Sequence, residues 1–139
     1  MPGLPDEIPA VRQWLEKAEH DLITARHTLS LHENCPFDTV CFHAQQCAEK
    51  YLKSLLVART LEIPRTHDLR LLVQRVEQAI INKLDISLEN VLPLNRYAVE
   101  TRYPGDWEPI SRQEAEEAVV IAEMIRQSVR QHLPEEALL

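Results

Sequence analysis

Apolar residues recur along most of the chain at the three- and four-residue steps that bring side chains onto one face of an α-helix. Between positions 9 and 31 the steps run four, three, four, three and four, from Val11 to Leu29. This repeat predicts an amphipathic helix over 9–31 that packs inside a helical bundle. The opposite side of this helix is expected to face solvent, and it carries Arg12, Glu16, Glu19, His20 and His27.

Four further segments carry helical patterns, and prolines or polar turns separate them. Their starts are marked by side chains that can accept the free N–H groups of a first helical turn. The expected helices run from about 38 to 59 with Asp38 as N-cap, from about 66 to 80 with Thr66 as N-cap, from about 87 to 98 with a kink or shift at Pro93, and from about 111 to 132 with the capping box Ser111–Glu114.

These five helices predict an all-α fold, an up-and-down bundle of four to five helices. We expect residues 9–133 to form one domain, with an N-terminal tail at 1–8 and a C-terminal tail at 134–139. Residues after Leu133 are expected to be frayed.

The second predicted helix is apolar over about half of its circumference. At 100° per residue, its apolar positions span an arc of about 180° from Cys47 to Leu56, whereas a peripheral helix needs a stripe of roughly 100°. We therefore expect this helix to contact more than one neighbour. Gln45 lies inside the arc, either as a border position that reaches water or at a subunit interface. The pair Glu49 and Lys53 indicates a solvated edge.

Composition excludes several classes of protein. The chain of 139 residues has two glycines, which argues against an all-β fold, and a formal net charge of −7, which removes the usual electrostatic reason to expect nucleic-acid binding. Cys35, Cys41 and Cys47 match no zinc spacing and are expected to be buried, reduced thiols. No metal, cofactor, signal peptide or membrane span is predicted, and we expect a cytoplasmic protein.

Two stretches carry candidate ligand-binding residues. In "PRTHDL", His67 and Asp68 stand at a helix start, where they form a polar pocket with Lys50 or Lys53, or where Asp68 simply caps the helix. In "RYAVETRYPGDW", arginines and aromatic residues surround a proline turn. That mixture suits phosphate contacts and base stacking, or alternatively closes one end of the bundle. Its members are Arg96, Tyr97, Arg102, Tyr103 and Trp107.

Four motifs in order, "AEHDLITA", "HAQQCAEKYLKSLL", "THDL" and "TRYPGD", resemble the HEPN domain family over about residues 10–130. The resemblance implies a homodimeric bundle of four or five helices that acts beside a minimal nucleotidyltransferase, frequently as toxin and antitoxin. It also implies a cleft that binds a nucleotide or RNA. The matching positions, taken as ligand-binding residues, are Lys50, Lys53, His67, Asp68, Arg102 and Tyr103.

Many HEPN proteins are metal-independent endoribonucleases, and this chain departs from their motif. The nuclease motif is an Arg, usually followed by a polar residue, with a His four to six residues further on. Arg96 is in place, but Tyr97 follows it, and Thr101, Arg102 and Tyr103 stand where the His belongs. Because the imidazole that would act as general acid or base near pH 7 is missing, Arg96 and Arg102 are the remaining candidate catalytic residues.

The sequence therefore favours a non-catalytic protein that binds a nucleotide or acts as the accessory partner of a nucleotidyltransferase. Two alternatives stay open: an endoribonuclease toxin, and a purely structural helical dimer.

Overall fold

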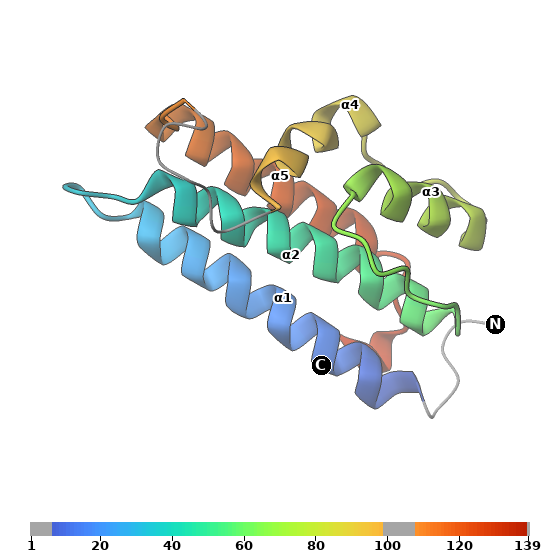
Figure 1. The fold of residues 1–139 in the computed structure, drawn as a ribbon. Coiled ribbons are helices and arrows are strands. Elements are labelled where there is room, and N and C mark those ends of the chain that lie inside the picture. Colours follow the sequence, from blue (N-terminus) through green and yellow to red (C-terminus); the bar gives the residue numbers. More distant parts are fainter. Residues whose placement is uncertain (1–6, 99–107, 139) are drawn as a thin grey trace.

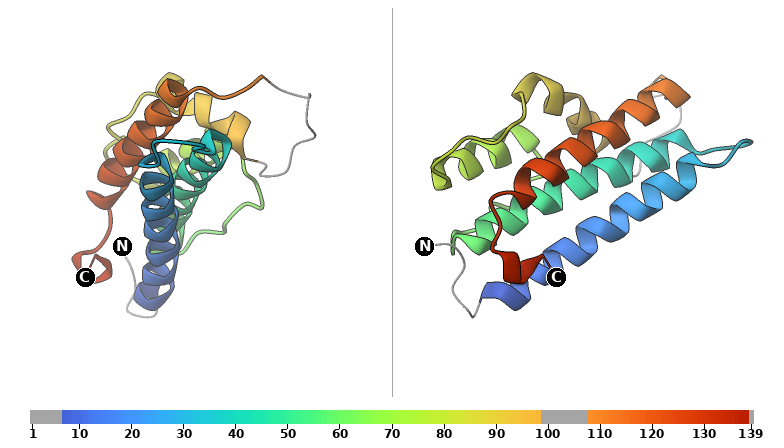
Figure 2. Two further views of the ribbon diagram at one scale, coloured as in Figure 1. Left: turned by 90° about the vertical axis from the view of Figure 1, so that its left-hand side faces the viewer. Right: turned by 180° about the vertical axis from the view of Figure 1, so that it is seen from behind.

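The computed structural model describes residues 7–98 and 108–138, and every element in these ranges is helical (Figure 1). The predicted all-α bundle is therefore confirmed. Its three long helices lie side by side, shorter helices cover a further side of the central one, and a last helical turn follows α5 (Figure 2). The elements are α1 (Ile8–Leu29), α2 (Phe37–Ala58), α3 (Leu69–Ala79), α4 (Leu88–Val91), the 3-10 segment η2 (Leu92–Tyr97), α5 (Arg112–Arg130) and the 3-10 turn η3 (Glu135–Ala137).

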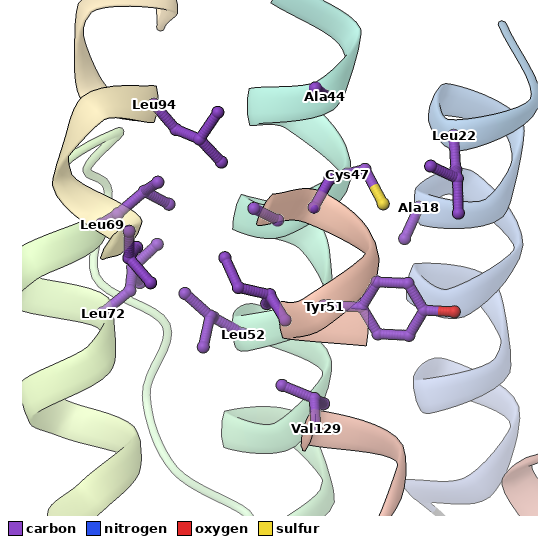
Figure 3. Packing of buried hydrophobic residues seen from close by; sticks show 14 of the residues in the cluster. Ala18, Leu22, Ala44, Cys47, Tyr51, Leu52, Leu69, Leu72, Leu94 and Val129 are labelled. Carbon is purple, nitrogen blue, oxygen red and sulfur yellow. The ribbon is translucent and has the colours of Figure 1, made fainter. Parts of the chain in front are cut away.

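α2 is the central helix, as its wide apolar arc predicts. It packs against α1, α3, α5 and η2. Its buried side chains point in different directions: Cys47 and Tyr51 lie toward α1, whereas Leu52 lies toward Leu69 and Leu72 of α3 (Figure 3). A helix with three or more neighbours needs an apolar surface this wide, because each contact removes a different sector from water.

Two of the predicted helix starts are wrong. Pro36, rather than Asp38, occupies the N-cap position of α2, and Asp38 lies in the first turn. Its carboxylate there faces the positive end of the helix dipole, which is favourable without an N-cap bond. α3 begins at Leu69 because Asp68 accepts the backbone N–H of Arg70 at 3.0 Å, whereas Thr66 accepts the N–H of Asp68.

Two other local predictions hold. Ser111 accepts the backbone N–H of Glu114 at 3.1 Å and so caps α5. Pro93 limits the fourth helix to a single α-turn, after which the backbone continues as η2. Proline lacks the N–H that an α-helix would need at this position, so the tighter 3-10 form is adopted.

Residues 134–138 are not frayed, contrary to prediction. η3 packs against α1, and Ala137 is buried. Arg12 donates from Nε to the backbone oxygen of Glu136 at 2.9 Å. The buried side chains of Leu133 and Ala137 thus hold this segment against the core. Chain ends without such contacts are usually frayed.

The three cysteines are free thiols. Cys41 and Cys47 are buried as expected, while Cys35 is half-buried. Burial raises the pKa of Cys41 to about 12, which keeps this thiol protonated and unreactive at neutral pH.

α2 ends in a turn that strains a β-branched residue. Thr60 has φ of 56°, its N–H bonds the oxygen of Val57, and the N–H of Leu61 bonds the oxygen of Leu56 at 3.0 Å. This is a Schellman turn, whose left-handed position favours glycine. We expect Thr60→Gly to raise the free energy of unfolding by about 1 kcal/mol, measured by urea denaturation. Thr39→Gly, inside α2 where φ is helical, is the control and should lower it.

Candidate ligand-binding site on α2

α2 runs between α1 and the segment 60–68 that leads to α3 (Figure 1), and few of its residues are accessible. From Val40 to Ala58, every residue is buried except four. The four recur at helical spacing and therefore share one side of the helix. We call them the α2 stripe: Phe42, His43, Gln46 and Lys50.

A buried carboxylate on α1 holds two members of the α2 stripe. Asp21 is 8 % exposed, and its two oxygens contact different partners. Oδ2 lies 2.6 Å from Lys50 Nζ, and Oδ1 lies 2.8 Å from His43 Nδ1. Because charge-assisted bonds of this kind are strong and directional, Asp21 fixes where both side chains lie on the stripe.

A second buried carboxylate, Glu49, organises the neighbouring network. It is 4 % exposed. Lys53 Nζ lies 3.2 Å from Glu49 Oε2, and His67 Nδ1 lies 2.8 Å from Oε1. The predicted solvated edge at Glu49 and Lys53 is therefore wrong, because His67 and the segment before α3 lie over Glu49.

Gln45 belongs to the same network and is fully buried. Its Nε2 donates to Glu49 Oε1 at 3.2 Å and to the backbone oxygen of His67 at 3.3 Å, and its Oε1 accepts from Gln46 at 2.7 Å. Both sequence interpretations of Gln45 are therefore wrong. It reaches neither water nor a surface, because its amide ties α2 to the segment before α3.

The structure brings together some of the predicted ligand-binding residues and separates others. Lys53 and His67 meet at Glu49, while Lys50 belongs to the adjacent Asp21 pair. Asp68 is used elsewhere: it caps α3 and accepts from Asn95 Nδ2 at 2.9 Å. Arg102, Tyr103 and Trp107 lie outside the described residues.

The comparisons with known proteins decide the family. The model of the HEPN domain matches residues 11–132. This chain belongs to the HEPN domain family. The crystal structure of ST0689, an archaeal HEPN homologue, shares its fold with a TM-score of 0.62 and 25 % sequence identity, over 87 % of this chain and 95 % of that one. No protein with a curated description matches the chain in sequence.

Arg96, the position that matches the Arg of the HEPN nuclease motif, is held in an ion pair. Its Nη1 lies 3.1 Å from Glu114 Oε2, to which the Tyr97 hydroxyl also donates. Burial and the Glu114 carboxylate raise the pKa of Tyr97, so this hydroxyl is no base near neutral pH. Within residues 7–98 and 108–138, no histidine bonds to Arg96. The bonds of Arg96 and Tyr97 to Glu114 hold η2 against α5.

Three residues of this site, Asp21, His43 and Glu49, were not among the ligand-binding residues predicted from the sequence. A signal for Asp21 was present: it stands three residues after Ala18 and four before Ala25, at a position that continues the apolar repeat of α1. A carboxylate at such a position requires a buried partner. His43 and Lys50, seven residues apart, lie on one side of α2 and supply that partner.

The described residues contain neither a candidate membrane span nor a candidate metal cluster. None of the described helices combines the length and apolar character that a membrane crossing needs. In the same ranges, no three His, Cys, Asp or Glu side chains gather closely enough to hold a metal ion.

Glu19, predicted to face solvent, instead connects three helices. It accepts from the Tyr51 hydroxyl and from Arg126 Nε, and Arg130 Nη1 lies 3.8 Å away. Burial alone would raise the pKa of Glu19, but the bonds from Tyr51 and Arg126 outweigh it and lower that pKa below its ordinary value of 4.5.

A carboxylate with a lowered pKa stabilises the fold above its unfolded-state pKa and loses that contribution as the pH falls through its folded-state pKa. We therefore expect Glu19→Gln to be less stable than wild type at neutral pH, and the difference to shrink below about pH 4.5. Thermal unfolding of both proteins between neutral and acid pH measures this. A constant difference over the whole range would contradict it, and Glu16→Gln, on the exposed side of α1, is the control.

Proposed function

We propose that this HEPN protein is a binding module without nuclease activity, which binds a nucleotide through the α2 stripe. In the same proposal it is a cytoplasmic homodimer that acts as the accessory partner of a minimal nucleotidyltransferase, within a toxin–antitoxin pair. The observation that carries the nucleotide proposal is the chemistry of the stripe. All four accessible residues of this part of α2 are aromatic, amide or basic.

The polar arrangement suits a phosphate-bearing ligand. Lys50, His43 and His67 offer N–H groups at the accessible surface, while the carboxylates that hold them, Asp21 and Glu49, are buried beneath. A ligand that approaches this surface therefore contacts N–H donors before it reaches the carboxylates. Such donors bind phosphate oxygens most strongly when they are charged. Phe42, whose ring packs edge-on against His43 at 5.3 Å, adds an aromatic surface for a base.

The absence of nuclease activity rests on the missing imidazole of the HEPN motif and on the ion pair of Arg96 with Glu114. A ribonuclease of this family needs a group that titrates near pH 7 beside the scissile phosphate. If the protein is no toxin, its expression leaves growth unchanged, and so does expression of Arg96→Ala. Growth arrest by the wild type that Arg96→Ala abolishes would establish the nuclease alternative instead.

Calorimetric titration with ATP tests the nucleotide proposal. We expect His43→Ala and Lys50→Met each to weaken binding at least about tenfold, because each removes a donor from the stripe. His43→Ala leaves the Lys50–Asp21 pair in place but removes the partner of Asp21 Oδ1, so thermal unfolding of each variant accompanies the titration and separates the ligand contact from the fold. Lys83→Ala, an exposed lysine between α3 and α4, is the matched control. Wild type that binds no nucleotide would contradict the proposal.

The partner proposal needs its own experiment. Co-expression with a minimal nucleotidyltransferase encoded next to this protein should give one complex on size exclusion, and analytical ultracentrifugation of this protein alone should give a dimer. A monomer at micromolar concentration would contradict the homodimer, and separate elution would contradict the partnership.

A further inference from the structure

An elongated hollow lies along the outer side of α5, next to α4 and η2. In the rear view α5 runs across the outside of the bundle with α4 beside it (Figure 2). The hollow has a volume of about 570 Å³, and its apolar lining includes Pro93, Val120, Ile121 and Met124. Val120 is 53 % exposed and Met124 is 39 % exposed. These side chains lie on the exposed side of α5, away from the core contacts of that helix.

A second hollow continues the first. It has a volume of about 190 Å³ and shares Met124, and it reaches Ser128 and Gln131 toward the end of α5. Together the two hollows border α5 from Gln113 to Gln131. At 1.5 Å per residue this is roughly 27 Å, the length of five helical turns. We call this surface the α5 groove.

The polar residues of the α5 groove give it a strong negative charge. Its rim carries the carboxylates of Asp85, Glu89, Glu116 and Glu117. No Lys, Arg or His is found among the described residues that line the two hollows. An apolar floor beside these carboxylates repels RNA and phosphate ligands and attracts a basic amphipathic surface.

We infer that the α5 groove docks an amphipathic helix of a partner protein, with apolar anchors on one face and Lys or Arg on either side of them. The groove is long enough for such a helix. Its apolar residues, Pro93, Val120, Ile121 and Met124, line the first hollow, where the central anchors of a partner helix with apolar residues at i, i+4, i+7 and i+11 would meet them. The basic residues of the partner then face the acidic rim. This inference does not depend on a nucleotide binding to the α2 stripe, which uses other residues of other helices.

A synthetic peptide tests the inference. The probe is a fluorescein-labelled helical peptide of about 18 residues, with leucines at i, i+4, i+7 and i+11 and arginines beside them. We expect it to bind the full-length protein in fluorescence anisotropy. The double variant Glu116→Lys with Glu117→Lys should weaken binding at least about tenfold. A peptide with alanine in place of leucine should bind as weakly.

The control is Glu33→Lys with Glu62→Lys, which changes the net charge equally at exposed positions on other parts of the chain. It should leave binding within about twofold of wild type, and circular dichroism should show that all variants fold. Three results would overturn the inference: wild type that does not bind the peptide, equal weakening by the control, or self-association of the wild type that Glu116→Lys with Glu117→Lys abolishes. The last result would show that a second copy of the chain covers the groove.

Discussion

Replacing Glu49 by alanine is expected to lower the free energy of unfolding by about 3 kcal/mol at neutral pH. Glu49 is the acceptor for Lys53, His67 and Gln45, and both Glu49 and Lys53 are less than 10 % exposed. Without the carboxylate, the Lys53 ammonium stays buried and unpaired, and the Gln45 amide loses one of its acceptors. The ring of Trp14, with its centroid 5.9 Å from Lys53 Nζ, offsets part of this loss.

Urea denaturation at pH 7 measures the effect. The double variant Glu49→Ala with Lys53→Met should recover at least half of the lost stability, because an apolar side chain removes the unpaired charge. Glu33→Ala, at an exposed position, should stay within about 0.5 kcal/mol of wild type. A loss below about 1 kcal/mol for Glu49→Ala would mean that Lys53 reaches water by moving, and that the network contributes little to the fold.

The bundle could be predicted because its main signal is local. The apolar steps of α1, the width of the apolar arc of α2 and the Ser111 cap of α5 each depend on residues within a few turns of one another. The helical period of such a segment does not depend on how the other helices are arranged. The starts of α2 and α3 were predicted wrongly for different reasons. α2 begins after Pro36, its N-cap residue, without a side-chain cap, whereas α3 is preceded by two polar residues, Thr66 and Asp68, of which Asp68 forms the cap.

The polar part of α2 could not be predicted in the same way. The sequence of a single helix does not distinguish a polar side that faces water from one that faces another polar segment of the chain. Glu49 and Lys53 were therefore interpreted as a solvated pair, although both are buried and His67, eighteen residues away, bonds Glu49. Tyr51 and Glu19, thirty-two residues apart, formed a bond that no local pattern indicated.

The residues of the segment before α3 and the family resemblance indicated the same part of the site. Both grouped His67 with Lys53, and these two side chains do meet at Glu49. Both also included Asp68, which the structure assigns to capping α3 and bonding Asn95. A motif shows that certain positions occur together but not why each is needed. A carboxylate at a helix start can serve as a helix cap or as a ligand-binding group, and the motif is the same in both cases.

The second large effect is expected in the contact between α2 and α3. Leu52 is fully buried and lies toward Leu69 and Leu72 (Figure 3). Leu52→Ala should lower the free energy of unfolding by about 3 kcal/mol, since it removes apolar contacts and leaves a cavity that a well-packed interior fills only in part. α3 has eleven residues and is too short to be stable alone, so it should loosen from α2 first.

Urea denaturation gives the total loss, and amide hydrogen exchange shows where it occurs. Exchange in α3 should accelerate more than exchange in α1 or α5, because Leu52 lies on the face of α2 that holds α3 and the segment before it. Leu31→Ala, which removes a side chain that is 45 % exposed, is the matched control and should change stability by less than about 0.5 kcal/mol. Equal acceleration in all helices would show that α3 unfolds only together with the whole bundle, and would refute the local part of the prediction.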